Sequence, residues 1–120
     1  MSKNPSVLKV KSFRFAIRII RLYQYLTDSK KEYVLSKQLL RSGTAIGALV
    51  REAQNAESKK DFVHKLGISQ KECDESMYWL ELLIETEYLN EKEFDAIYAD
   101  ATELLKMLRS AIITSKKSIS

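Results

Sequence analysis

His64 and Cys73 are the residues of this 120-residue chain whose types most readily suggest a metal site or a nucleophile. Asp61 precedes His64 by the helical spacing of a metal-ligand pair, but a di-iron bundle needs two such histidines, and the chain has one. A nucleophilic cysteine needs an adjacent base, and His64 lies about 13 Å from Cys73 along one helix at 1.5 Å per residue. We therefore expect no metal site and no catalytic cysteine, with His64 at the surface or an interface and Cys73 in the core.

Gly43 and Gly47 lie inside a helical pattern and do not form a phosphate-binding loop. Such a loop ends in Gly-Lys-Ser/Thr and follows a strand, and neither feature is present here. Their spacing matches the membrane helix-dimer motif, but Arg41, Arg51 and Glu52 flank them. Two glycines inside a helix cost about 1 kcal/mol each relative to alanine. We predict that the backbone of another helix packs closely at this point.

A polar group formed by Arg41, Glu52, Glu72 and Glu75 combines an arginine with three carboxylates on two predicted helices. Such a cluster inside a bundle can fix the register of helices or subunits. It can also bind a ligand or a partner. Paired carboxylates can act as acid and base, but no electrophile accompanies them. We expect a polar network or interface without catalytic residues, and therefore predict that the protein is not an enzyme and uses no cofactor.

A basic stripe is the best candidate for contact with nucleic acid. It consists of Lys11, Arg14, Arg18 and Arg21. Four cations on one rigid helix face can follow a row of phosphates. The stripe can equally be a solvated face, or form salt bridges with acids such as Glu81 and Glu85. The same helix could also lie on an anionic membrane surface, but the bundle needs its apolar face, so we expect no membrane partner.

The net charge of +4 is unevenly distributed along the chain. Residues 1–60 hold 13 basic and 4 acidic side chains, whereas residues 61–120 hold 7 basic and 12 acidic ones. Such asymmetry indicates either a half that binds polyanions or two halves that attract each other. The single cysteine, the lack of a secretory signal and the lack of an apolar run of about 20 residues favour a cytoplasmic protein. The first 27 residues, with six Lys or Arg and no acid, also resemble a transit peptide.

Three capping patterns divide the chain into helices. Ser29 precedes Glu32, Ser58 precedes Asp61 and Asn90 precedes Glu93, each by three residues, which is the spacing of a capping box. The apolar periodicity then predicts helices at about 10–26, 31–56, 59–87 and 91–114. Short links between long helices make neighbours antiparallel. We predict an all-α fold, an antiparallel up-down four-helix bundle formed by a single domain over residues 1–120.

The first predicted helix has more apolar surface than a small bundle needs. One stripe consists of Phe13, Ala16, Ile17, Ile20 and Tyr23, and an adjoining stripe of Phe15, Ile19, Leu22 and Leu26. Together they cover more than half the helix circumference, while a core-facing helix needs an apolar face of about 100°. The excess predicts a second buried contact, most simply with another subunit.

The stretch from Gln38 to Leu83 resembles the four-helix bundle family that includes the 23S rRNA intervening-sequence proteins. More distantly, it is similar to the accessory variability proteins of diversity-generating retroelements. The similarity is carried by Gln38-Leu-Leu-Arg-Ser-Gly-Thr-Ala-Ile-Gly-Ala48, Arg51-Glu-Ala53, Ala56, Ser58, Asp61-Phe62, Lys65, Lys71-Glu72, Glu75 and Tyr78-Trp-Leu80. Phe13–Leu26 and Tyr88–Ile112 resemble the family's first and last helices. Gln38 and Asp61 of this run join the candidate polar network.

The resemblance implies a ring of bundles, often a pentamer, without catalytic residues. Some members of the family are encoded within interrupted ribosomal RNA genes, and the retroelement relatives bind nucleic acid and a reverse transcriptase. We therefore expect a non-enzymatic homo-oligomer that binds RNA or DNA through a basic surface. The alternative is a scaffold or adaptor that binds a protein partner and no nucleic acid.

Overall fold

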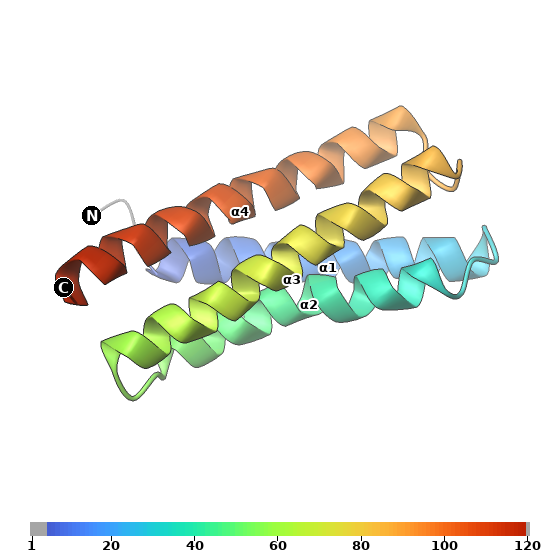
Figure 1. Cartoon of the computed structure of the whole chain (residues 1–120). Helices are drawn as coiled ribbons and strands as arrows, with labels where there is room; N and C mark the ends of the chain where they lie inside the picture. Colours follow the sequence, from blue (N-terminus) through green and yellow to red (C-terminus); the bar gives the residue numbers. More distant parts are fainter. Residues whose placement is uncertain (1–4, 120) are drawn as a thin grey trace.

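The computed structural model describes residues 5–119 and shows four α-helices joined by short loops. The helices are α1 (Pro5–Asp28), α2 (Leu35–Gln54), α3 (Lys59–Glu85) and α4 (Glu91–Ile119). They alternate in direction and form a bundle of 48 × 22 × 19 Å (Figure 1). No strand occurs within residues 5–119. The predicted all-α, up-down four-helix bundle is confirmed.

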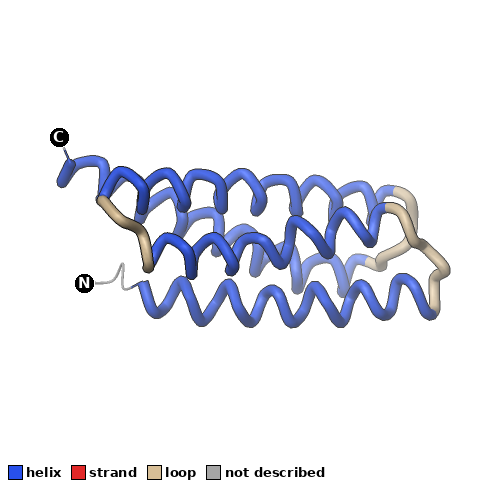
Figure 2. The backbone as a smooth tube through the Cα atoms, turned by 90° about the horizontal axis from the view of Figure 1, so that it is seen from below, coloured by secondary structure: helices blue, strands red, loops and turns tan. Residues whose placement is uncertain are grey.

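The helices pack in a cycle of neighbours. α2 packs extensively on α3, α1 on α2 and α3 on α4, while α1 and α4 make the smallest contact. α1 and α3 are therefore diagonal to each other. Both chain ends lie at the same end of the bundle as the α2–α3 loop, and the other two loops lie at the opposite end (Figures 1 and 2).

Two of the three predicted caps are present, and the one at Asn90 is a complete capping box. The Ser58 hydroxyl accepts a hydrogen bond of 3.0 Å from the Asp61 backbone N–H at the start of α3. At the start of α4, the Asn90 side chain accepts from the Glu93 N–H at 2.8 Å, and the Glu93 carboxylate accepts from the Asn90 N–H at 3.0 Å. Each cap satisfies backbone donors that have no partner inside the helix.

The predicted start of α2 is wrong. The helix begins at Leu35, and the carboxylate of Glu32 takes the role assigned to Ser29. Its two oxygens accept from the backbone N–H groups of Val34, Leu35 and Ser36 at 3.0, 2.8 and 2.7 Å. Lys31 just before it has a positive φ of 57°, so the chain reverses here and cannot yet be helical.

The other helix limits differ from expectation by smaller amounts. α1 starts at Pro5, where the sequence predicted about residue 10, because proline fits the first turn of a helix. α2 and α3 end at Gln54 and Glu85, each two residues early. α4 continues to Ile119, five residues beyond its predicted end near residue 114.

The core confirms the predicted close approach at the two glycines. A Cβ atom on Gly47 would lie 3.3 Å from the backbone oxygen of Ser12, and one on Gly43 would lie 2.8 Å from the side chain of Ile19. The approaching helix is α1. Of the two apolar stripes of α1, one faces the core: Phe15, Ile19 and Leu26 are fully buried, and Leu22 is half-buried.

The other stripe of α1 remains largely exposed. Phe13, Ile17 and Ile20 are 56%, 39% and 41% exposed, and Val10 beside them is 47% exposed. The bundle core uses one side of α1, so the predicted second contact is not made within the chain. Among residues 5–119, no helix has an apolar stretch of the length that a membrane crossing requires.

Candidate nucleic-acid and partner surfaces

The predicted basic stripe is divided by contacts with α4. The ammonium of Lys11 lies 3.1 Å from the Glu103 carboxylate, and Arg18 pairs with Asp100. Arg14 and Arg21 are exposed and form no ion pair with another side chain of the described chain. Two of the four cations therefore already have carboxylate partners.

The partners suggested from the sequence, Glu81 and Glu85, were wrong. Both lie on α3, which is diagonal to α1, whereas α4 is the neighbour of α1 on this side. Glu81 instead accepts a hydrogen bond of 2.6 Å from the hydroxyl of Tyr98. This hydrogen bond, with burial and the Glu81 charge, raises the pKa of Tyr98 to about 12.

Part of the predicted polar network forms between α2 and α3. The Arg41 guanidinium contacts Glu72 at 3.3 Å and pairs with Glu75, which also accepts from the Trp79 indole N–H at 3.1 Å. The hydrogen bond with Glu75 is the main factor that raises the pKa of Arg41. The Arg41 side chain is 52% exposed. The cluster thus lies at the surface, whereas the sequence interpretation placed it inside the bundle.

The remaining members of that network lie elsewhere. Glu52 pairs with Lys65 at 3.1 Å, more than two turns along α2 from Arg41. The Asp61 carboxylate accepts a 3.3 Å hydrogen bond from the Glu57 backbone N–H in the loop before α3. Gln38 is exposed. The six residues therefore do not converge on one site.

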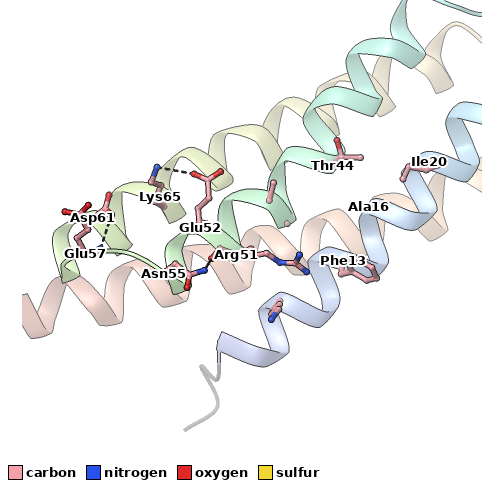
Figure 3. A pocket seen from close by; sticks show the side chains of 13 residues that line it. Phe13, Ala16, Ile20, Thr44, Arg51, Glu52, Asn55, Glu57, Asp61 and Lys65 are labelled. Carbon is pink, nitrogen blue, oxygen red and sulfur yellow. Dashed lines mark hydrogen bonds and ion pairs between the residues drawn. The ribbon is translucent and has the colours of Figure 1, made fainter.

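A groove between α1 and α2 has a volume of about 700 Å³. Phe13, Ala16 and Ile20 line it from α1, and Arg51 extends from α2 toward that helix (Figure 3). Its full lining is Lys9, Phe13, Ala16, Ile20, Thr44, Gly47, Ala48, Arg51, Glu52, Asn55, Glu57, Asp61 and Lys65. It thus combines the exposed apolar stripe of α1 with a charged rim at the α2–α3 loop.

Sequence reasoning missed this groove, although one signal pointed to it. The small residues Gly47 and Ala48 leave space on α2 that larger side chains would fill. Lys9 and Arg51 belong to no candidate site predicted from the sequence, and only the fold brings both of them to the same groove.

His64 and Cys73 occupy the positions expected from the sequence. Cys73 is fully buried, its thiol donates to the Ala101 carbonyl oxygen at 3.3 Å, and burial raises its pKa to about 12. His64 is exposed. Within residues 5–119, no three His, Cys, Asp or Glu side chains come together as a group that could hold a metal ion.

The fold and these surfaces define a class of protein: an up-down four-helix bundle whose charged clusters and apolar groove lie on its exterior. The chain belongs to the 23S rRNA-intervening sequence protein family, whose profile matches residues 6–110. This confirms the resemblance drawn from Gln38 to Leu83.

A crystal structure with a similar fold comes from Bacteroides thetaiotaomicron VPI-5482 and is described as a protein with unknown function from the S23 ribosomal protein family. The two chains are 52% identical, with a TM-score of 0.89 over 90% of this chain and 96% of that one. A comparison with curated proteins finds no match.

Proposed function

We propose that this protein is a non-enzymatic, oligomeric bundle that binds RNA or DNA through a basic surface. The observation that supports this best is the concentration of negative charge in one part of the molecule. Residues 71–103 carry 11 of the 16 acidic side chains and only two basic ones. The other described residues hold 17 basic and 5 acidic side chains. A surface with such an excess of cations attracts polyanions.

Assembly is the second part of the proposal, and the exposed stripe of α1 supports it. Exposed apolar side chains that adjoin one another mark interaction surfaces, and Val10, Phe13, Ile17 and Ile20 follow one another along the helix. A second copy that covers this stripe would remove it from water. A ring, such as the pentamer that the family resemblance implies, would repeat the basic surface, and repeated contacts raise overall affinity.

Fluorescence anisotropy with labelled RNA and DNA across a salt series, combined with the oligomer mass of the same sample, tests the binding. The logarithm of the affinity should fall linearly with the logarithm of salt, by about 0.7 per phosphate contacted on single strands and about 0.9 on duplexes. If an intact oligomer shows no binding at low salt, nucleic-acid binding is refuted.

A matched pair of substitutions tests the assembly. Ile17→Asp places a charge in the exposed stripe of α1, whereas Ile113→Asp places the same charge on α4, where Ile113 is 56% exposed. Only Ile17→Asp should reduce the oligomer mass, with helical content unchanged in both. Equal masses for the two variants would show that the α1 stripe is not the subunit contact.

The groove between α1 and α2 favours a second candidate function, a scaffold that binds a protein partner. Its apolar wall of Phe13, Ala16 and Ile20 is suited to the apolar face of a helix. Stoichiometric capture of one protein that survives nuclease treatment and is lost on Ala48→Glu would favour this function. Retention of the protein by Ala48→Glu would exclude the groove.

A further inference from the structure

The charges of this protein are segregated along the long axis of the bundle as well as along the chain. Near the middle, Ser12 lies against Gly47, and Ser69 hydrogen-bonds to the Ile46 carbonyl at 2.9 Å. One half of the bundle holds the chain termini and the α2–α3 loop. This half, called the basic end, consists of residues 5–15, 46–70 and 104–119. It carries 11 basic and 3 acidic side chains, whereas the opposite half carries 8 basic and 13 acidic ones.

Cations of α1 and α2 that lie beside the acidic residues are already paired. Lys11 contacts Glu103, Arg18 contacts Asp100, and Arg41 contacts two carboxylates of α3. An external phosphate would have to displace these carboxylates to reach the cations. Of the four cations of the α1 stripe, only Arg14 and Arg21 could bind a phosphate without displacing a carboxylate, so the stripe is a weaker binding surface than its sequence suggests.

The basic end holds only three acidic side chains. Of its three acids, Glu52 is paired with Lys65, and Asp61 accepts a backbone N–H group. The exposed basic residues at this end are Lys9, Arg14, Arg51, Lys59, Lys60, Lys106, Arg109, Lys116 and Lys117. Their number exceeds what the acids of the same end can neutralise.

The fold brings several of these cations together from distant parts of the chain. Lys59 and Lys60 start α3, and Lys116 and Lys117 lie in the last turn of α4. The Lys59 ammonium donates to the Ser118 hydroxyl at 2.8 Å, which joins the two segments directly. Two pairs of adjacent lysines therefore share one tip of the bundle.

We infer that the basic end, centred on the start of α3 and the last turn of α4, is the surface that receives the phosphate backbone of a nucleic acid. This rests on the proposed nucleic-acid binding and centres it on α3 and α4, whereas the sequence placed it on the α1 stripe. Lysine ammonium groups bind phosphate as point charges and do not read base sequence in this way. The opposite end, rich in carboxylates, repels the same polyanion. Binding is therefore oriented along the bundle axis and independent of sequence.

Two lysine pairs with similar sequence contexts provide a matched test. Lys59 and Lys60 follow Ser58 at the basic end, and Lys30 and Lys31 follow Ser29 at the acidic end. All four side chains are exposed. The double variant Lys59→Gln/Lys60→Gln and the double variant Lys30→Gln/Lys31→Gln lose the same charge. Each is titrated with a labelled RNA single strand and with a DNA duplex across a salt series, with helical content and oligomer mass as controls.

The basic-end variant should lose two phosphate contacts. The slope of log affinity against log salt then becomes shallower by about 1.4 on the single strand and about 1.8 on the duplex. If the electrostatic contribution vanishes at about 1 M salt, affinity at about 0.1 M falls about 25-fold and about 60-fold, respectively. The acidic-end variant should retain the slope of the wild-type protein.

The failures of the two proposals are distinguishable. If the wild-type protein binds neither probe, nucleic-acid binding itself is refuted. If it binds and both variants lose equal affinity, binding follows net charge and the assignment to the basic end is wrong. A larger loss in Arg18→Gln/Arg21→Gln, whose residues both lie outside the basic end, would return the site to the α1 stripe. If neither probe binds and salt-sensitive self-association disappears only in Lys59→Gln/Lys60→Gln, the basic end contacts the acidic end of another copy.

Discussion

Replacement of Glu32 by alanine should destabilise the bundle more than loss of an ordinary helix cap. Glu32 is 7% exposed, and its carboxylate accepts from three successive backbone N–H groups. Loss of a cap residue costs about 0.5–2 kcal/mol, and hydrogen bonds to a charged group contribute about 1.5–3 kcal/mol each. Water can reach the exposed Val34, while the donor of buried Ser36 loses its acceptor. We expect a loss of about 3 kcal/mol, which lowers the melting temperature by about 10 °C.

The effect of Glu32 should also depend on pH. Burial alone would raise its pKa, but the hydrogen bonds from Leu35, Ser36 and Val34 outweigh burial and lower the pKa below the ordinary value of 4.5. The stabilisation is therefore fully present above the pKa of the unfolded state. It is lost as pH falls through the lower pKa of the folded state. The difference in unfolding free energy between the wild-type protein and Glu32→Gln should shrink from neutral pH to about pH 3.

Urea denaturation followed by circular dichroism, at one fixed protomer concentration, measures both effects. The concentration is fixed because assembly stabilises the folded state by mass action. Ser29→Ala is the matched control, since the sequence predicts Ser29 as the cap and the structure gives this role to Glu32. It should cost less than about 0.5 kcal/mol. Equal costs for Ser29→Ala and Glu32→Ala, or a Glu32→Gln effect that is independent of pH, would refute this reasoning.

Two further predictions concern the core. Gly47→Val should destabilise the protein by about 1–3 kcal/mol in urea denaturation, because a Cβ on Gly47 would already lie 3.3 Å from the Ser12 backbone. Gly67→Ala is the control, because nothing lies within 4 Å of a Cβ at Gly67. This change should stabilise α3 by up to about 1 kcal/mol. Similar effects of the two changes would contradict the close approach of α1 and α2. Cys73, whose buried thiol has a pKa of about 12, should react with a thiol reagent only as fast as the bundle opens. Rapid labelling of the folded protein would show that the thiol is accessible.

Local signals in the sequence were sufficient to predict the fold. The caps at Ser58 and Asn90 depend on contacts within one turn, which residue type and spacing specify. Gly43 and Gly47 predicted a close helix contact, because the destabilisation that two glycines cause inside a helix requires a compensating contact. The prediction of a cap at Ser29 was wrong because Lys31 adopts a positive φ, a backbone conformation that its residue type does not predict.

The surfaces were harder to predict because they depend on which helices become neighbours. The sequence contains the cations of α1, but their pairing with α4 requires α1 and α4 to be adjacent. Arg41, Glu72 and Glu75 could be grouped, since α2 and α3 follow each other in the chain. Charge counted along the chain showed an excess in the first 60 residues. The separation of basic and acidic side chains between the two ends of the bundle becomes visible only in the antiparallel fold.

A lysine footprint in the presence and absence of RNA tests the central claim most directly. The protein is acetylated at low salt with and without an unlabelled RNA strand, and modification of each lysine is measured by mass spectrometry. RNA should protect Lys59 and Lys60 at the basic end and leave Lys30 and Lys31 at the acidic end unchanged. Equal protection at the two ends, or protection at neither, would contradict a phosphate-binding surface at the basic end of the bundle.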